Sequence, residues 1–198
     1  MMVYLVDDEP DLLESLSWML AAEGIDSQSF SDGASLLAAL PPQAVGVAVL
    51  DINMPQLDGL ELQQQLRQLH PSLGLIFLTG YGSVPKAVQA LQAGALDFLE
   101  KPVAPARLLT AIAAAQQWAQ THAQQHLQQQ ALQQKLALLT EREAQLLPLV
   151  VAGKANKVIC AELHLAQRTV EIHRRNLFAK MAVANAAELA LLLGSQRS

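Results

Sequence analysis

The fold of this chain is decided by Val47-Ala48-Val49-Leu50-Asp51, an apolar run that stops at an acid. A short run of this kind predicts an interior parallel strand whose carboxyl end emerges at an edge of the sheet. Three further apolar runs stop at the pair Asp7-Asp8, at Thr79 and, after Glu100, at Lys101. Because the carboxyl ends of parallel strands share one edge, the sequence predicts three carboxylates, one hydroxyl and one ammonium group at a single site.

Segments with helical spacing of apolar residues separate these runs. The predicted strands end near Val6, Phe30, Leu50, Leu78 and Leu99. This βα alternation, repeated five times, predicts a five-stranded parallel sheet of flavodoxin-like order 2-1-3-4-5 with helices on both faces. In that order the ligand crevice lies between the ends of the first and third strands, where Asp7, Asp8 and Asp51 fall.

Crowded carboxylates repel one another unless a cation neutralises them, and an all-oxygen site suits Mg²⁺. The predicted ligands are Asp7, Asp8, Asp51 and the backbone carbonyl of Asn53. Lys101 and the Thr79 hydroxyl are then placed to hold a phosphoryl group, and Asp51 is the candidate nucleophile. The alternative is that these residues only cap helices or solvate loops.

These residues resemble the receiver domain of two-component response regulators. Asp7 and Asp8 match its acidic pair, and Asp51 matches its phosphoacceptor. The resemblance implies that Thr79 and Phe98 form the conformational switch, that Lys101 acts with Asp51 and Thr79 in phosphoryl transfer, and that a sensor histidine kinase is the phosphodonor.

Composition separates the two halves of the 198-residue chain, which is 52% apolar. Residues 1–134 hold 13 acids and 4 bases, whereas residues 135–198 hold 5 acids and 9 bases. A negative first half suits a cation site, and a positive second half is typical of a nucleic-acid binder. The sequence shows neither a membrane-spanning run nor a signal peptide, so we expect a cytoplasmic protein without membrane contact.

A glutamine-rich segment joins the halves, since ten of the nineteen residues at 116–134 are glutamine. Glutamine favours helix, so we predict a helical linker over residues 119–138, with a flexible coil as the alternative. His122 and His126 stand at metal-ligand spacing, but without a nearby acid or cysteine we interpret them as solvated linker residues.

The last sixty residues predict helices only. Thr140 and Glu143 form a capping box that begins the first helix, and Gly153 ends it. Asn156 is predicted to cap the second helix. The third is expected from Gln167 to about Met181, and Asn185 is predicted to cap the fourth, over residues 186–193. A tight turn between the second and third helices predicts a helix-turn-helix unit.

Residues 139–193 resemble the LuxR-type output domain, which together with the receiver is typical of the FixJ/NarL subfamily. In a helix-turn-helix the second helix reads base edges. The predicted base readers are Arg168, Thr169, Glu171, Ile172 and Arg175. The predicted phosphate contacts are Lys154, Lys157, His173, Arg174 and Lys180, with Asn156 as a further DNA-binding residue. An ordinary solvated basic face is the alternative.

The sequence thus predicts a phosphorylation-switched transcription factor that binds promoter DNA as a homodimer, with RNA polymerase as a further candidate partner. Its expected parts are a receiver at 1–118, the linker at 119–138 and the DNA-binding domain at 139–198. Two alternatives remain. One is a phosphatase or phosphotransferase enzyme that uses the same aspartyl chemistry, and the other is a receiver whose output contacts protein or RNA.

Overall fold

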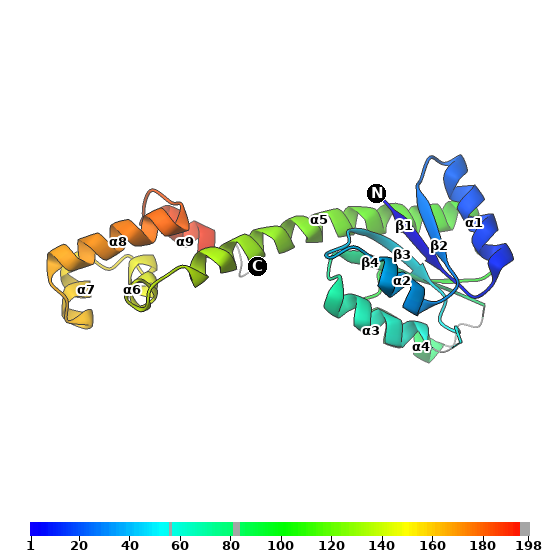
Figure 1. Ribbon diagram of the computed structural model, residues 1–198, viewed down its shortest axis with the longest axis horizontal. Helices are drawn as coiled ribbons and strands as arrows, with labels where there is room; N and C mark the ends of the chain where they lie inside the picture. Colours follow the sequence, from blue (N-terminus) through cyan, green and yellow to red (C-terminus); the bar gives the residue numbers. More distant parts are fainter. Residues whose placement is uncertain (56, 81–83, 195–198) are drawn as a thin grey trace. The chain divides into compact units, whose positions relative to one another are not determined.

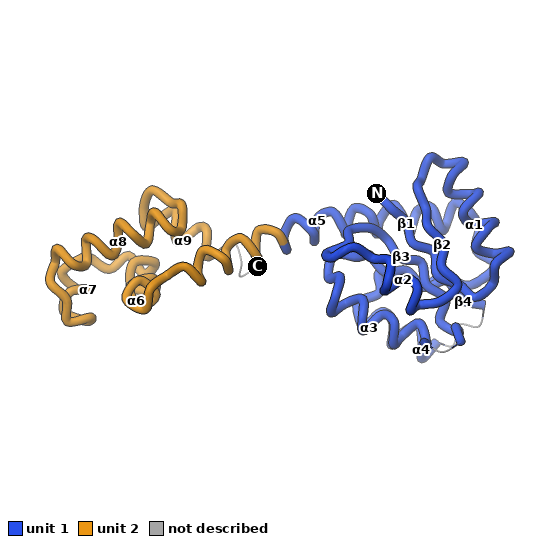
Figure 2. The backbone as a smooth tube through the Cα atoms, in the orientation of Figure 1, with its two compact units in different colours: residues 1–126 blue, residues 127–198 orange. Residues whose placement is uncertain are grey.

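The computed structural model describes residues 1–55, 57–80 and 84–194. The chain divides into two compact units, Met1–His126 and Leu127–Ser198 (Figure 2). Residues 195–198, the end of the predicted DNA-binding domain, lie outside the described residues. In the described ranges, no single helix has the length and apolar character to cross a membrane. Only the helices Gln167–Met181 and Ala186–Gly194 taken together, with a 46° bend between them, meet that requirement by length and composition.

Unit 1 is built on a parallel sheet (Figure 1). The strands are β1 (Val3–Val6), β2 (Ser27–Phe30), β3 (Gly46–Leu50), β4 (Leu73–Thr79) and β5 (Asp97–Glu100). They lie in the order β2-β1-β3-β4-β5. Every residue of β1, β3 and β4 is buried, as expected for strands that are covered on both faces. The predicted flavodoxin-like fold is therefore confirmed.

Helices cover both faces of this sheet. They are α1 (Pro10–Ala22), α2 (Gly33–Ala39), α3 (Gly59–Leu69), α4 (Val84–Gln92) and α5 (Pro105–Ala137). Alternate strand residues point to opposite faces. Val3 and Leu5 of β1 therefore belong to the core formed with α1 and α5, whereas Tyr4 and Val6 belong to the core formed with α2, α3 and α4.

A glycine lets α3 begin directly beside the end of β3. A Cβ atom at Gly59 would overlap the carbonyl oxygen of Asp51. Asp58 precedes this glycine and caps α3 by accepting a hydrogen bond from the Leu60 amide at 2.8 Å. The close approach therefore brings the helix to the loop that follows Asp51.

The glutamine-rich segment is helical, because α5 continues through it to Ala137. This agrees with the helical prediction and not with the coil alternative. His122 stacks on Trp118 at 3.7 Å between ring centroids, and its Nδ1 lies 3.0 Å from the Trp118 carbonyl oxygen. The exact limits of the linker stay a prediction.

Unit 2 consists of the end of α5 and four further helices among the described residues. These are α6 (Glu141–Val151), α7 (Asn156–Leu163), α8 (Gln167–Met181) and α9 (Ala186–Gly194). Their core contains Leu146, Ile159, Val170, Leu177 and Leu189. The tight turn between α7 and α8 includes His164 in the left-handed conformation, and the predicted helix-turn-helix is confirmed.

The predicted helix caps of unit 2 are confirmed with one exception. Thr140 and Glu143 form the capping box, and Asn185 Oδ1 accepts from the Glu188 amide at 2.9 Å. The prediction for Asn156 was wrong, because Asn156 is already the first residue of α7. Ala155 takes the extended capping conformation and offers no side-chain acceptor.

Candidate functional site

The sheet brings four chain segments to one edge. Val6 pairs with Leu50 between β1 and β3, and the Asp51 amide continues this ladder by donating to the Val6 carbonyl at 2.9 Å. The Lys101 amide likewise donates to the Thr79 carbonyl at 2.8 Å. Asp51 and Lys101 therefore start from hydrogen-bonded backbone positions directly after β3 and β5.

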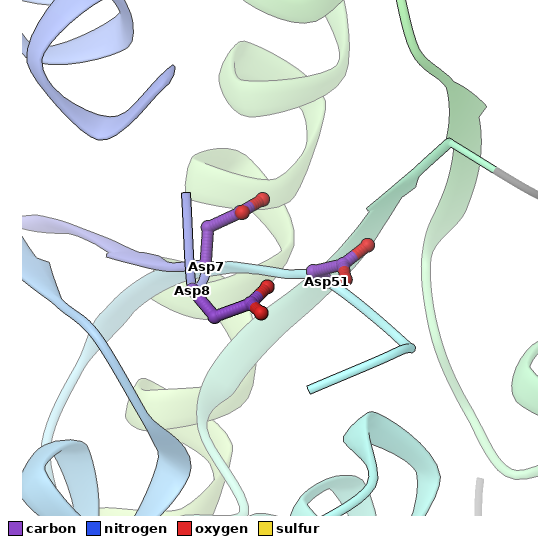
Figure 3. A group of neighbouring side chains, drawn as sticks. All are labelled: Asp7, Asp8 and Asp51. Atoms are coloured by element: carbon purple, nitrogen blue, oxygen red, sulfur yellow. The ribbon is translucent and has the colours of Figure 1, made fainter. Parts of the chain in front are cut away.

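Three acids meet at this edge, as Figure 3 shows. One carboxylate oxygen from each of Asp7, Asp8 and Asp51 lies within 4.8 Å of the other two. Asp7 is 3% exposed and Asp51 is 5% exposed, whereas Asp8 faces solvent. The predicted acidic cluster is thus present in the structure.

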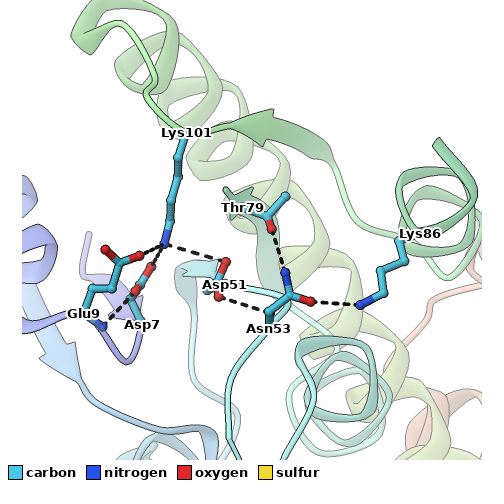
Figure 4. A network of polar contacts seen from close by, with 7 residues as sticks. All are labelled: Asp7, Glu9, Asp51, Asn53, Thr79, Lys86 and Lys101. Carbon is cyan, nitrogen blue, oxygen red and sulfur yellow. Dashed lines mark hydrogen bonds and ion pairs between the residues drawn. The ribbon is translucent and has the colours of Figure 1, made fainter. Parts of the chain in front are cut away.

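Lys101 reaches into the acidic cluster (Figure 4). Its Nζ lies 2.6 Å from Asp7 Oδ2, 3.0 Å from Glu9 Oε1 and 3.7 Å from Asp51 Oδ1. Burial opposes the charge of Lys101, but hydrogen bonds to Asp7 and Glu9 and the charges of Asp51 and Asp7 outweigh burial and raise its pKa. Glu9 was not predicted, although it directly follows the acidic pair in sequence.

Asp51 carries its charge in unfavourable surroundings. Burial raises its pKa above the ordinary value of 3.8; Lys101 acts to lower it, while the charge of Asp7 raises it further. The Asn53 amide donates to Asp51 Oδ2 at 3.1 Å. The buried Oδ1 has no hydrogen-bond partner among the described residues. This oxygen is therefore suited to meet a cation or a phosphorus centre.

The side-chain amide of Asn53 connects Thr79 with Lys86 beside the acids. Its Nδ2 is 3.5 Å from Thr79 Oγ1, at the outer limit of a hydrogen bond, and its Oδ1 accepts from Lys86 Nζ at 2.9 Å (Figure 4). Thr79 itself is fully buried. Lys86 comes from α4 and was not predicted, because nothing in the sequence spacing links it to the strand ends.

Phe98 lies in β5, where it pairs with Phe77 of β4. Its half-buried ring packs against Phe77 of β4, with 6.4 Å between centroids. A ring that is neither fully buried nor fully exposed can change its position at modest cost in apolar burial.

In unit 2, α8 exposes one side to solvent. Val170, Leu177 and Met181 are buried against the core of the unit. The predicted base readers Arg168, Glu171, Ile172 and Arg175 are exposed and line one shallow hollow, and Thr169 is half-buried. Their spacing of three and four residues places the exposed four on one face of the helix.

The residues predicted to contact phosphates differ from one another in exposure and in the partners they have in the structure. Lys157 is exposed, His173 is half-buried, and Lys154 pairs with Glu162 at 2.6 Å. The Arg174 guanidinium lies 5.5 Å from the Phe178 ring centroid, and Arg174 lines a hollow with Asn156.

Lys180 is held inside unit 2. Its Nζ lies 2.7 Å from Glu143 Oε2 and 2.9 Å from the Leu138 carbonyl oxygen. Glu143 is buried, so this ammonium group supplies the charge that its carboxylate needs. The placement favours a structural role for Lys180 over the predicted phosphate contact.

Two family models match the chain. Residues 3–113 match the response regulator receiver domain, and residues 137–193 match the bacterial regulatory proteins of the luxR family. Among curated relatives, the response regulator protein TodT of Pseudomonas putida is 35% identical over 94% of this chain and 82% of TodT. The transcriptional regulatory protein FixJ of Rhizobium meliloti is 38% identical over 90% of this chain and 88% of FixJ.

Two solved structures of response regulators are similar to this chain over nearly its whole length. The response regulator StyR, known at low resolution, is similar with a TM-score of 0.84 at 36% identity, covering 98% of both chains. Full-length FixJ from B. japonicum gives a TM-score of 0.60 at 34% identity, covering 98% of this chain and 96% of FixJ. The chain therefore belongs to the FixJ/NarL subfamily of response regulators, in which a receiver domain and a LuxR-type DNA-binding domain together imply phosphorylation-dependent regulation of transcription.

Proposed function

We propose that a sensor histidine kinase phosphorylates Asp51, and that this promotes dimerisation and sequence-specific binding to promoter DNA. One observation carries the proposal: the buried Asp51 carboxylate lies at the same sheet edge as Lys101 and Thr79. The exposed face of α8 in a helix-turn-helix supports the DNA-binding half. We place this regulator in the cytoplasm, together with the DNA it would bind.

Phosphoryl transfer to Asp51 is a nucleophilic displacement. A carboxylate oxygen attacks the phosphorus of the phosphohistidine, and the bond between phosphorus and the imidazole nitrogen breaks. The electron pair of that bond leaves with the imidazole, and the new bond to oxygen gives an acyl phosphate. Lys101, 3.7 Å from Asp51 Oδ1, needs little movement to neutralise phosphoryl oxygens.

The donor set suits Mg²⁺. Three clustered carboxylates, among them the buried Asp51 Oδ1 that accepts no hydrogen bond within the described residues, provide the oxygen ligands that this hard cation prefers. Asp7, Asp8, Asp51 and the Asn53 carbonyl would hold the ion. When bound, it supplies positive charge that offsets repulsion between the carboxylates and the phosphoryl oxygens. Lys101 pairs with Asp7 at 2.6 Å, so a bound Mg²⁺ would share that carboxylate with the ammonium group.

Thr79 and Phe98 are the proposed switch. A Thr79 hydroxyl drawn toward the phosphoryl group leaves space into which the half-buried Phe98 ring can turn. Because Phe98 lies in β5, next to α4, its movement reshapes a face on which Val88 and Leu91 are already exposed. That reshaped face is where we expect two receivers to pair.

The output reaches DNA through α8 and its flanks. We propose that Arg168, Thr169, Glu171, Ile172 and Arg175 contact base edges. The proposed backbone contacts are Lys154, Asn156, Lys157, His173 and Arg174. RNA polymerase is a further proposed partner of the bound dimer. The proposal includes no turnover of an external substrate, since the chemistry at Asp51 acts on the protein itself.

Phosphorylation at Asp51 is tested by intact-mass measurement after treatment with acetyl phosphate. We expect one phosphoryl group on the parent protein when Mg²⁺ is present and none after chelation. Asp51→Asn removes the nucleophile and should gain none. Asp26→Asn is the matched control, because Asp26 is exposed and lies at the opposite end of the sheet, before β2. An unchanged gain of mass in Asp51→Asn would disprove the assignment.

Regulation of DNA binding is tested by footprinting a promoter fragment with and without acetyl phosphate. Protection of a defined sequence that strengthens on phosphorylation supports the proposal. Equal protection by the parent and by Asp51→Asn under both conditions would contradict a phosphorylation switch, whatever the DNA affinity.

A further inference from the structure

Lys86 of α4 contacts the phosphoacceptor site, although it is not among the site residues predicted from the sequence. Its Nζ donates to Asn53 Oδ1 at 2.9 Å and lies 4.0 Å from Asp58 Oδ2 (Figure 4). The Lys86 side chain is 38% exposed, so it crosses the surface from α4 to the loop that follows β3. A lysine outside the strand ends therefore contacts the residue two positions after Asp51.

The contact fixes the orientation of the Asn53 amide. An ammonium group only donates hydrogen bonds, so it must face the amide oxygen and not the NH₂ group. With Oδ1 turned to Lys86, the NH₂ group is left facing Thr79, and Nδ2 lies 3.5 Å from Thr79 Oγ1. The backbone of Asn53 is held separately, because its N–H donates to Asp51 Oδ2.

The amide in turn decides the role of the Thr79 hydroxyl. A hydroxyl has one proton to donate and two lone pairs that accept. When Asn53 Nδ2 faces the oxygen as a donor, the Thr79 proton is directed elsewhere. The Asp51 side of the site is where a phosphoryl group would present acceptor oxygens.

We propose that Lys86 is a positioning residue for phosphoryl transfer: it orients the Asn53 amide and, through it, keeps the Thr79 hydroxyl as a donor toward the phosphoryl group. This inference rests on the proposed phosphorylation of Asp51. Lys86 also adds a positive charge to the rim of a site that gains negative charge on phosphorylation. Its contact with Asn53 ties α4 to the site.

The test is the rate constant for phosphorylation of the full chain by acetyl phosphate at saturating Mg²⁺, followed by intact mass. Lys86→Met removes the donor and keeps a long side chain, and we expect it to slow phosphorylation roughly three- to tenfold. Lys86→Arg keeps a cationic donor and should restore most of the rate. Gln89→Met is the matched control, because Gln89 is exposed on the same helix.

A double-mutant cycle with Asn53→Ala separates positioning through Asn53 from a general charge effect. If Lys86 acts through the amide, Lys86→Met should cause no further loss once Asn53 is replaced by alanine. Magnesium affinity, measured by calorimetry, should be no lower in Lys86→Met than in the parent, because the variant removes a positive charge near the cation site.

Three outcomes would overturn the proposal. Equal rates for the parent and Lys86→Met would show that the contact has no kinetic role. The same loss in the Asn53→Ala background would show that Lys86 does not act through the amide. A parent chain that gains no phosphoryl group would overturn the proposed function itself, and this inference with it.

Discussion

The Asp51 carboxylate is held in surroundings that oppose its charge. It is buried beside Asp7, and burial is the main reason that its pKa is raised. Replacing it with a neutral isostere should relieve this strain in the metal-free state. We expect Asp51→Asn to melt a few degrees higher than the parent in the presence of a chelator, and thermal melts followed by circular dichroism measure this. A lower melting temperature would show that the pairing with Lys101 outweighs burial.

Asp8 differs from its two neighbours because it faces solvent. We expect Asp8→Ala to weaken magnesium binding without loss of fold, since one of the three clustered carboxylates is removed and repulsion in the metal-free state falls. Calorimetric titration with Mg²⁺ measures the affinity. Glu14→Ala serves as control, because Glu14 is an exposed acid on α1. Equal affinity in Asp8→Ala and the parent would remove Asp8 from the proposed ligands.

The acids, Thr79 and Lys101 were predictable from sequence, but the contacts made by Glu9 and Lys86 were not. A buried strand fixes where its last residue emerges, so Asp51 and Thr79 could be placed from apolar runs alone. Lys86 and Glu9 reach the site through long side chains. Their contacts depend on rotamers and on the position of α4, which strand periodicity does not encode.

The C-terminal ends of α5 and α8 are fastened to each other by two lysines. Lys135 of α5 donates to the Met181 carbonyl at 3.1 Å, and Lys180 of α8 donates to the Leu138 carbonyl at 2.9 Å. Carbonyls at a helix end lack partners within the helix, and lysines near that end satisfy them. This contact fixes the end of the linker helix to the helix that carries the proposed base readers.

Glu143, which pairs with Lys180, makes the stability of unit 2 depend on pH. Burial acts to raise its pKa, but hydrogen bonds from Lys180 and Thr140 outweigh burial and hold the pKa below the ordinary value of 4.5. The unfolded chain therefore takes up this proton more readily than the folded protein. The resulting stability is present above pH 4.5 and is lost as the pH falls through the lowered pKa.

We expect Lys180→Ala to lower the free energy of unfolding of unit 2 by about 3 kcal/mol, because a buried carboxylate loses its cation. The decline in stability below pH 4.5 should also become smaller, since Glu143 is no longer held charged. Urea unfolding at several pH values measures both effects. Lys157→Ala, at an exposed lysine of α7, is the control. A loss equal to that of the control would contradict the structural role.

Two neighbouring arginines of α8 should have different roles in DNA binding, Arg174 at a phosphate and Arg175 at a base. Arg174 is half-buried against Phe178, whereas Arg175 is on the exposed face. We expect Arg174→Ala to weaken binding to all DNA sequences and to reduce the salt slope by about 1, as for a lost phosphate contact. Arg175→Ala should cost about 1 to 3 kcal/mol on the specific site and relax specificity at one position. Similar losses on specific and random DNA for both variants would refute this division.

Helix positions in unit 2 followed from periodicity and caps, and the one wrong cap is instructive. Asparagine is a favoured N-cap, yet Asn156 lies one residue inside α7, where Ala155 adopts the capping backbone. Cap preference is worth only about 1 kcal/mol, less than the burial of Ile159 on the same helix. Tertiary packing therefore set the start of the helix.

The helix α9 exposes more apolar surface than the packing of one face requires, which bears on how two copies of the chain assemble. Leu189 is fully buried in the core of unit 2, whereas Leu191 is 73% exposed. Exposed leucines can be isolated surface residues, but here the helix belongs to a domain expected to bind DNA in pairs. We therefore expect α9 to supply a second dimer contact on DNA, in addition to the receiver contact that phosphorylation promotes.

Two-fold pairing would set two copies of α8 about one DNA turn apart, roughly 34 Å, and so predicts an inverted-repeat operator. Sedimentation with and without acetyl phosphate should show a rise in dimer for the parent and none for Asp51→Asn. Leu191→Ser should leave the receiver-driven dimer intact in free solution but weaken cooperative binding to the two half-sites, because only the α9 contact is removed. A phosphorylated protein that stays monomeric both free and on its operator would end the dimer proposal.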